Sequence, residues 1–190
     1  MPEPASAARE RILETASRLF YERGIRAVGV DTIVAEANVA KTTLYQHFKT
    51  KDDLIAAYLQ ASDENLRAWF STLLDGGDDS PEERLLAVFR QMGDWVARAG
   101  FRGCGFINAS MELADRAHPG SVVAAGHKDH VLDAFAALAR QAGVDDAERL
   151  ARELLVLLDG AFAGSAMQGT TAPFETAERA AALLLRARGL

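Results

Sequence analysis

Residues 30–54 constrain this chain more than any other segment, because apolar residues follow a helical period on both sides of a short polar turn. Apolar pairs spaced four residues apart flank that turn, and they are Ile33 with Ala37 before it and Leu44 with Phe48 after it. Between the pairs stands Asn38, which tolerates the left-handed backbone conformation of a sharp helix–helix turn. The segment therefore predicts two short helices in a helix-turn-helix arrangement.

The second predicted helix carries a polar outer face, which is what a recognition helix in the major groove of DNA requires. Glutamine can pair with adenine and lysine with guanine, so we expect four side chains to reach base edges: Lys41, Thr42, Thr43 and Gln46. Other side chains suit phosphate contacts, which fix register without reading sequence: Tyr45, His47, Lys51 and, as a weaker candidate, Thr32 at the start of the preceding helix. A merely solvated helix face is the alternative.

This segment closely resembles the DNA-binding domain of the TetR family of transcriptional regulators. The residues that carry the resemblance are Ile33, Ala37, Val39, Lys41, Thr43, Leu44, Tyr45, His47, Phe48, Lys51 and Leu54. Two positions depart from the family pattern. Asn38 stands where glycine is common, and Ala40 stands where a serine or threonine often caps the recognition helix. The missing cap is expected to cost about 1 kcal/mol.

The resemblance implies an all-α protein with two domains. Residues 1–54 would form a three-helix DNA-binding domain, and residues 55–190 a helical domain for ligand binding and dimerisation. The implied partners are a palindromic double-stranded operator, a small-molecule effector and a second copy of the chain bound through the last two long helices. Repression, rather than activation, is expected from the resemblance alone.

Composition is compatible with this interpretation. The net charge of −6 comes entirely from residues 56–190, while residues 1–55 carry eight basic and eight acidic residues. An acidic C-terminal part and a neutral N-terminal part suit a protein that contacts DNA only through its N-terminal part. We expect a cytoplasmic location, because the chain has a single cysteine, no signal peptide and no apolar run of the roughly 18 residues that a membrane span needs.

Helical signals dominate the remainder of the chain, and together they predict about nine helices and no strand. Two starts are sharply defined: a capping box over residues 50–53, and Ser80 followed by Pro81. Residues 145–148 are a third predicted cap, for a long helix that is apolar nearly all round between residues 154 and 166. That helix is either a central core helix or, in addition, a subunit interface, and the resemblance favours the interface.

Large apolar and a few polar residues are candidates for an effector pocket between the C-terminal helices. The set is Phe70, Phe89, Met92, Trp95, Cys104, Phe106, Asn108, Met111, Glu112, His127 and Phe162. Plain core packing is the alternative for each of them. Nothing in the sequence identifies the ligand.

Cys104 leaves a second mode of sensing open. Most lone cysteines are inert, but Arg102 and a following helix could activate this thiol, which would make a redox- or electrophile-sensing repressor. His127 and His130 lie three residues apart, yet a metal site needs further ligands, so no metal is expected. No catalytic arrangement and no phosphate-binding loop is present, so we expect neither an enzyme nor a cofactor. A helical binding protein without specific DNA affinity is the remaining alternative.

Overall fold

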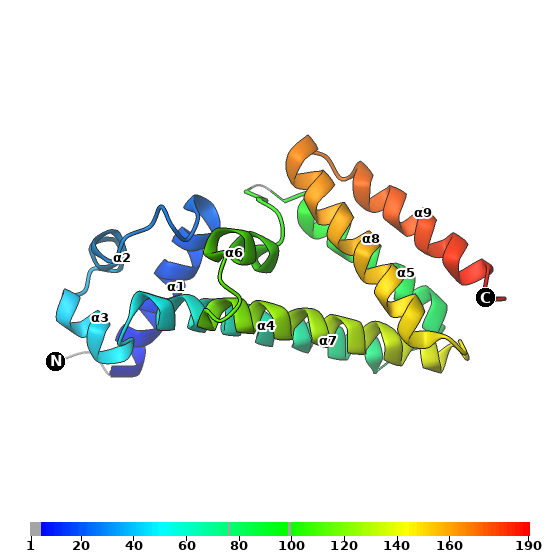
Figure 1. Cartoon of the computed structure of the whole chain (residues 1–190), viewed down its shortest axis with the longest axis horizontal. Coiled ribbons are helices and arrows are strands. Elements are labelled where there is room, and N and C mark those ends of the chain that lie inside the picture. The colour runs from blue at the N-terminus through cyan, green and yellow to red at the C-terminus, as the bar shows by residue number, and fades with distance from the viewer. Residues whose placement is uncertain (1–4, 76, 99) are drawn as a thin grey trace. The chain divides into compact units, whose positions relative to one another are not determined.

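The computed structural model describes residues 5–75, 77–98 and 100–190. Within them it has nine α-helices and no strand, so the all-α prediction is confirmed (Figure 1). The helices are α1 (Ala5–Arg23), α2 (Val30–Ala37), α3 (Lys41–His47), α4 (Lys51–Leu74), α5 (Pro81–Val96), α6 (Gly105–Leu113), α7 (Pro119–Gln141), α8 (Ala147–Gln168) and α9 (Ala172–Arg186). None of these described helices combines the length and the apolar character that a membrane-spanning segment requires.

The described residues form two compact units. The first unit holds those up to Asn65 together with Gly105–His127, and the second holds those of Leu66–Cys104 and Lys128–Leu190. The functional boundary that we predict after residue 54 concerns DNA binding, and it stays a prediction.

In the first unit, α1 packs against both α2 and α3. Each helix contributes large apolar side chains that are almost fully buried, among them Ile12 and Leu19 of α1, Ile33 of α2 and Leu44 of α3. Removing such side chains from water is the main force that holds helices too short to be stable alone. The apolar spacing in the sequence therefore becomes the core of this three-helix group.

Asn38 makes the turn between α2 and α3 in the predicted way. Its backbone has φ 52° and ψ 51°, the left-handed conformation. Its N–H donates to the carbonyl of Ala35 at 3.3 Å, and the N–H of Val39 donates to that of Val34 at 3.1 Å. This pair of bonds satisfies the last carbonyls of α2 and turns the chain sharply into α3.

Two of the predicted helix starts are confirmed by hydrogen bonds. At α4, the N–H of Asp53 donates to Thr50 Oγ1 and the N–H of Thr50 donates to Asp53 Oδ2, both at 3.0 Å. At α5, the N–H of Glu83 donates to Ser80 Oγ at 3.3 Å, and Pro81 occupies the first turn. Ala40, at the start of α3, makes no side-chain cap, which is also as expected.

In the second unit, α9 packs along both α5 and α8 (Figure 1). Glycines allow these close approaches. A Cβ at Gly93 of α5 would lie 3.3 Å from Phe174 Cβ of α9, and one at Gly164 of α8 would lie 3.1 Å from Pro173 Cβ. The small residues of α8 therefore serve packing within the chain at least at Gly164.

Arg84 is a buried cation that ties three helices of the second unit together. From α5, its Nη1 donates to the carbonyls of Leu73 and Leu74 at the end of α4, at 3.1 and 2.9 Å. Its Nη2 donates to Gln141 Oε1, in the last residue of α7, at 2.8 Å. Its Nε is buried without a hydrogen-bond partner among the described residues. The guanidinium thus caps the end of α4, whose last carbonyls have no partner within the helix.

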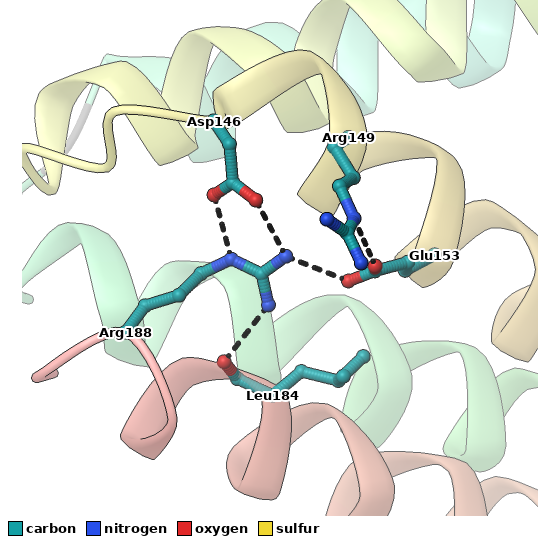
Figure 2. A network of polar contacts seen from close by, with 5 residues as sticks. All are labelled: Asp146, Arg149, Glu153, Leu184 and Arg188. Atoms are coloured by element: carbon teal, nitrogen blue, oxygen red, sulfur yellow. Dashed lines mark hydrogen bonds and ion pairs between the residues drawn. The ribbon is translucent and has the colours of Figure 1, made fainter.

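The predicted cap of α8 is wrong in its chemistry, although the helix begins where it was expected. Asp146 precedes the helix but its side chain makes no capping bond. Its carboxylate instead accepts from Arg188 Nε at 2.8 Å and Nη2 at 3.0 Å (Figure 2). Arg188 also reaches Glu153 Oε2 at 2.9 Å, and Glu153 in turn accepts from Arg149. A bidentate arginine is a stronger partner than a backbone amide, so the long-range pair wins.

Candidate nucleic-acid interface

The exposed side of α3 gathers six of the residues expected to contact DNA. Leu44 is fully buried and anchors the helix, whereas Tyr45 is 43% exposed. Around it are Lys41, Thr42 and Gln46, which are exposed, and Thr43 and His47, which are half-buried. Six of the seven residues of this helix thus present donors and acceptors at its exposed side without a buried polar cost.

Thr32 and Asp31 lie on α2, beside this face. Thr32 is half-buried. Asp31 is exposed, and its Oδ1 accepts from Lys41 Nζ at 2.8 Å. This hydrogen bond raises the pKa of Lys41 above its ordinary value, so the ammonium stays charged. In the free protein Lys41 is therefore paired with a carboxylate of the same chain.

Lys51 differs from the other candidates, because its ammonium is directed inward. Nζ donates to the carbonyl of Ile25 at 2.6 Å and lies 5.8 Å from the centre of the Phe20 ring. Partial burial lowers the pKa of Lys51. In this arrangement the side chain supports the connector between α1 and α2, and its phosphate contact stays a prediction.

Three arginines of α1 contact residues of the helix-turn-helix, and none of them was predicted from the sequence. Arg11 Nε donates to the carbonyl of Ala37 at 2.9 Å, and Arg9 stacks on the Phe48 ring with 5.2 Å to its centre. Arg18 is paired with Glu36. Their common signal is only that they are basic residues of α1, which could equally have been solvated.

Glu112, predicted for an effector pocket, lies against the connector between α1 and α2. Its Oε2 accepts from the N–H of Arg26 at 2.9 Å. Gly24 has φ +91°, and a Cβ there would lie 3.1 Å from Glu112 Oε1. Glu112 of α6 and Lys51 of α4 thus both bind the connector between α1 and α2. Together they fix the position from which the chain enters α2.

The other pocket candidates fall into the two units. In the first unit the His127 ring stacks on Phe106 with 3.7 Å between centres, and His127 Nδ1 lies 2.8 Å from Asp63 Oδ1. Asn108 is half-buried, whereas Met111 is 77% exposed. Among the described residues, no group of three or more metal-ligating side chains comes together.

In the second unit the aromatic candidates form two groups. Phe70 and Phe89 both contact Phe135, with ring centres 6.3 Å apart in each case. Trp95 and Phe162 lie 6.3 Å apart. Met92 is half-buried, and Cys104 is a buried free thiol. These contacts show packing among the aromatic residues, and a ligand contact stays a prediction for each of them.

An apolar groove of about 430 Å³ runs along α8 and α9. Its walls include Val156, Gly160 and Gly164 of α8 and Pro173 and Ala177 of α9. A Cβ at Gly160 would meet nothing within 4 Å, so this face of α8 is open. Three large apolar side chains on these helices are far more exposed than is usual, and they are Val156 (72%), Met167 (87%) and Leu183 (63%).

Two short helices at a left-handed turn, with a buried anchor and a polar outer face, define a helix-turn-helix protein. Residues 12–58 match the family described as bacterial regulatory proteins, tetR family. The structure is similar to a TetR-family transcriptional regulator from Streptomyces coelicolor, with a TM-score of 0.91 and 38% identity over 97% of both chains. A TetR transcriptional regulator from Streptomyces avermitilis shares 34% identity over 92% of this chain and 97% of that one, with a TM-score of 0.78.

Curated relatives agree. The regulator YjdC of Escherichia coli is 24% identical over 178 residues, which are 94% of this chain and 93% of that protein. The transcriptional activator FasR of Mycolicibacterium smegmatis is 36% identical over 93 residues, but these span only 49% of this chain and 42% of FasR. The chain belongs to the TetR family of bacterial transcriptional regulators. Ligand-responsive regulation through DNA binding is typical of that family.

Proposed function

We propose that this regulator represses transcription by binding a palindromic operator as a homodimer, and that a small molecule releases it. The observation that carries the proposal is the exposed polar side of α3, held on its other side by the buried Leu44. Residues 1–54 bind DNA in this scheme, and residues 55–190 dimerise and sense the effector. The protein acts in the cytoplasm, where its operator lies.

Base edges are contacted by Lys41, Thr42, Thr43 and Gln46 in the proposed complex. Phosphates are contacted by Thr32, Tyr45, His47 and Lys51. Lys51 has to break its hydrogen bond to the carbonyl of Ile25 before it can reach a phosphate, so its phosphate contact depends on a rearrangement of the side chain. Lys41 has to exchange Asp31 for the operator.

The dimer forms through the faces of α8 and α9 that carry the apolar groove. The support is the groove itself, the open space at Gly160, and the exposed apolar Val156 and Leu183. Contiguous apolar surface of this kind marks an interaction site in a soluble protein. A two-fold dimer also places two recognition helices to read the two halves of a palindrome.

Selection of genomic fragments by the purified protein, across a salt series, tests operator binding. We expect a palindromic site whose affinity falls steeply with salt, because each phosphate contact contributes a slope of about −0.9 in a log–log plot. Gln46→Ala should weaken operator binding by about 1–3 kcal/mol, the usual worth of a base contact. Gln60→Ala, on the exposed side of α4, is the matched control and should bind as the parent does. A folded dimer that enriches no site would contradict the proposal.

Light scattering after size-exclusion chromatography tests the dimer separately. Val156→Arg puts a charge into the proposed interface and should yield monomers at concentrations where the parent is dimeric. Met111→Arg is the control, because Met111 is equally exposed but lies on α6. Dimers that persist in Val156→Arg would exclude this face.

A further inference from the structure

A second cavity, of about 260 Å³, lies in the unit that contains α5, α8 and α9. Its walls come from the end of α5, the segment that follows it, the end of α8 and the turn into α9. The residues that matter for its chemistry are Val96, Arg98, Phe101, Ser165, Thr170 and Thr171. The volume is just below the range of about 300–1,000 Å³ that holds most ligands, so only a small molecule fits.

Ser165 supplies an unsatisfied polar group at this cavity. The residue is 1% exposed, and its Oγ has no hydrogen-bond partner among the described residues. Three other helical serines, unlike Ser165 and Ser121, donate to the carbonyl four residues earlier, as Ser17 does to Leu13 at 2.7 Å and Ser62 to Tyr58 at 3.0 Å. A buried hydroxyl without a partner is costly, so its presence in the wall of a cavity points to a bound group that completes it.

Arg98 supplies a cation that no described residue neutralises. In the same unit, Arg90, Arg140 and Arg188 all pair with carboxylates. Arg98 is exposed, no hydrogen bond or ion pair joins its side chain to the described residues, and no acidic residue lines the cavity. An unpaired guanidinium beside hydroxyl groups favours an anion, and a carboxylate matches its planar fork.

Apolar residues also line the cavity, and one of them carries an aromatic ring. Phe101 contacts Trp95 edge-on, with 5.5 Å between ring centres, and lies 6.3 Å from Phe162. Val96 is buried beside it. One part of the wall therefore suits an apolar body, and another part suits an acid group.

We propose that this cavity binds a small monocarboxylate with an apolar or aromatic body. Arg98 pairs with the carboxylate, the Ser165 hydroxyl donates to it, and Phe101 contacts the body. The role of this ligand as the effector rests on the function proposed above. The turn between α8 and α9 forms part of the wall, so occupancy would alter the helices of the proposed dimer interface.

Isothermal titration of the protein with benzoate, and with neutral benzamide for comparison, tests the site. We expect saturable millimolar or tighter binding of benzoate, and binding at least about tenfold weaker for benzamide, because the charged hydrogen bonds are lost. Arg98→Gln should weaken benzoate to a similar extent. Ser165→Ala should weaken it several-fold without lowering thermal stability, because the lost hydroxyl has no partner in the free protein. Arg186→Gln, another exposed arginine, is the matched control and should bind as the parent does.

Absence of saturable benzoate binding by the folded parent would overturn the proposal, as would unchanged affinity in both Arg98→Gln and Ser165→Ala. Operator binding measured on the same samples without benzoate separates this failure from failure of the regulatory function. Both variants should bind the operator as the parent does. If the parent binds benzoate but no operator, the site stands and the effector role falls.

Discussion

Replacing Arg84 by methionine tests whether one buried cation holds the second unit together. The change removes three hydrogen bonds from a charged donor, to Leu73, Leu74 and Gln141, each worth about 1.5–3 kcal/mol. Methionine keeps most of the apolar contact, and loss of the unpartnered Nε removes a penalty, so part of the cost is offset. We expect a net loss of about 3 kcal/mol in the free energy of unfolding, since breaking buried charged networks typically costs about 3–5 kcal/mol.

Urea unfolding at fixed protein concentration is the appropriate assay, because the apparent stability of a dimer depends on concentration. A loss of about 3 kcal/mol corresponds to a fall in Tm of about 6–12 °C for a chain of this size. Arg90→Met is the control on the same helix, because Arg90 makes exposed ion pairs with Glu83 and Glu178 that are worth about 1 kcal/mol at most. Equal losses in the two variants, or a loss below about 1 kcal/mol for Arg84→Met, would refute the reasoning.

Three further outcomes follow from local geometry. Glu112→Ala removes the acceptor of the Arg26 N–H, so native-state hydrogen exchange of that amide should quicken about tenfold, and unchanged protection would show that the bond is not formed. Asn38→Ala should cost about 1–2 kcal/mol in urea unfolding because of its positive φ, whereas Asn38→Gly should cost less. Arg188 holds the pKa of Asp146 below its ordinary value of 3.8, so their pairing stabilises the fold above that pH and is lost as the pH falls through the lowered pKa. The destabilisation caused by Arg188→Gln should therefore shrink between about pH 6 and pH 3, and an equal effect at both would contradict the assignment.

Features governed by neighbouring residues could be predicted from the sequence. The turn at Asn38 and the caps at Thr50 and Ser80 each depend on bonds that span five residues or fewer, and the structure confirms them. The recognition helix belongs to this group, since one buried face and one exposed face follow directly from its period.

Features governed by distant residues could not be predicted. Glu112 and its partner Arg26 are 86 residues apart, and Asp146 and Arg188 are 42 apart. A carboxylate near a helix start has an obvious local partner in the backbone, and only the packing of the helices shows that an arginine reaches it instead. For the same reason the inward direction of Lys51 was not evident from its position after α3.

The effector pocket was the part of the protein that could be predicted least from the sequence. Large apolar residues on helices indicate burial, but they do not tell a packed core from a cavity. The cavity beside Phe101 was missed because its signals are an unpaired arginine and a serine without a partner. Neither condition is visible before the fold is known.

The ion pair between Lys41 and Asp31 changes what the recognition helix gains when it meets DNA. A bare lysine that reaches a phosphate frees a condensed cation, and that release favours binding through entropy. Lys41 arrives already paired with Asp31, so in the proposed complex it leaves an anionic oxygen for a base edge, and Asp31 must find a cation or water in its place. The protein thereby loses part of its sequence-independent affinity for duplex DNA. Geometric fit to the operator sequence then accounts for a larger share of the binding free energy.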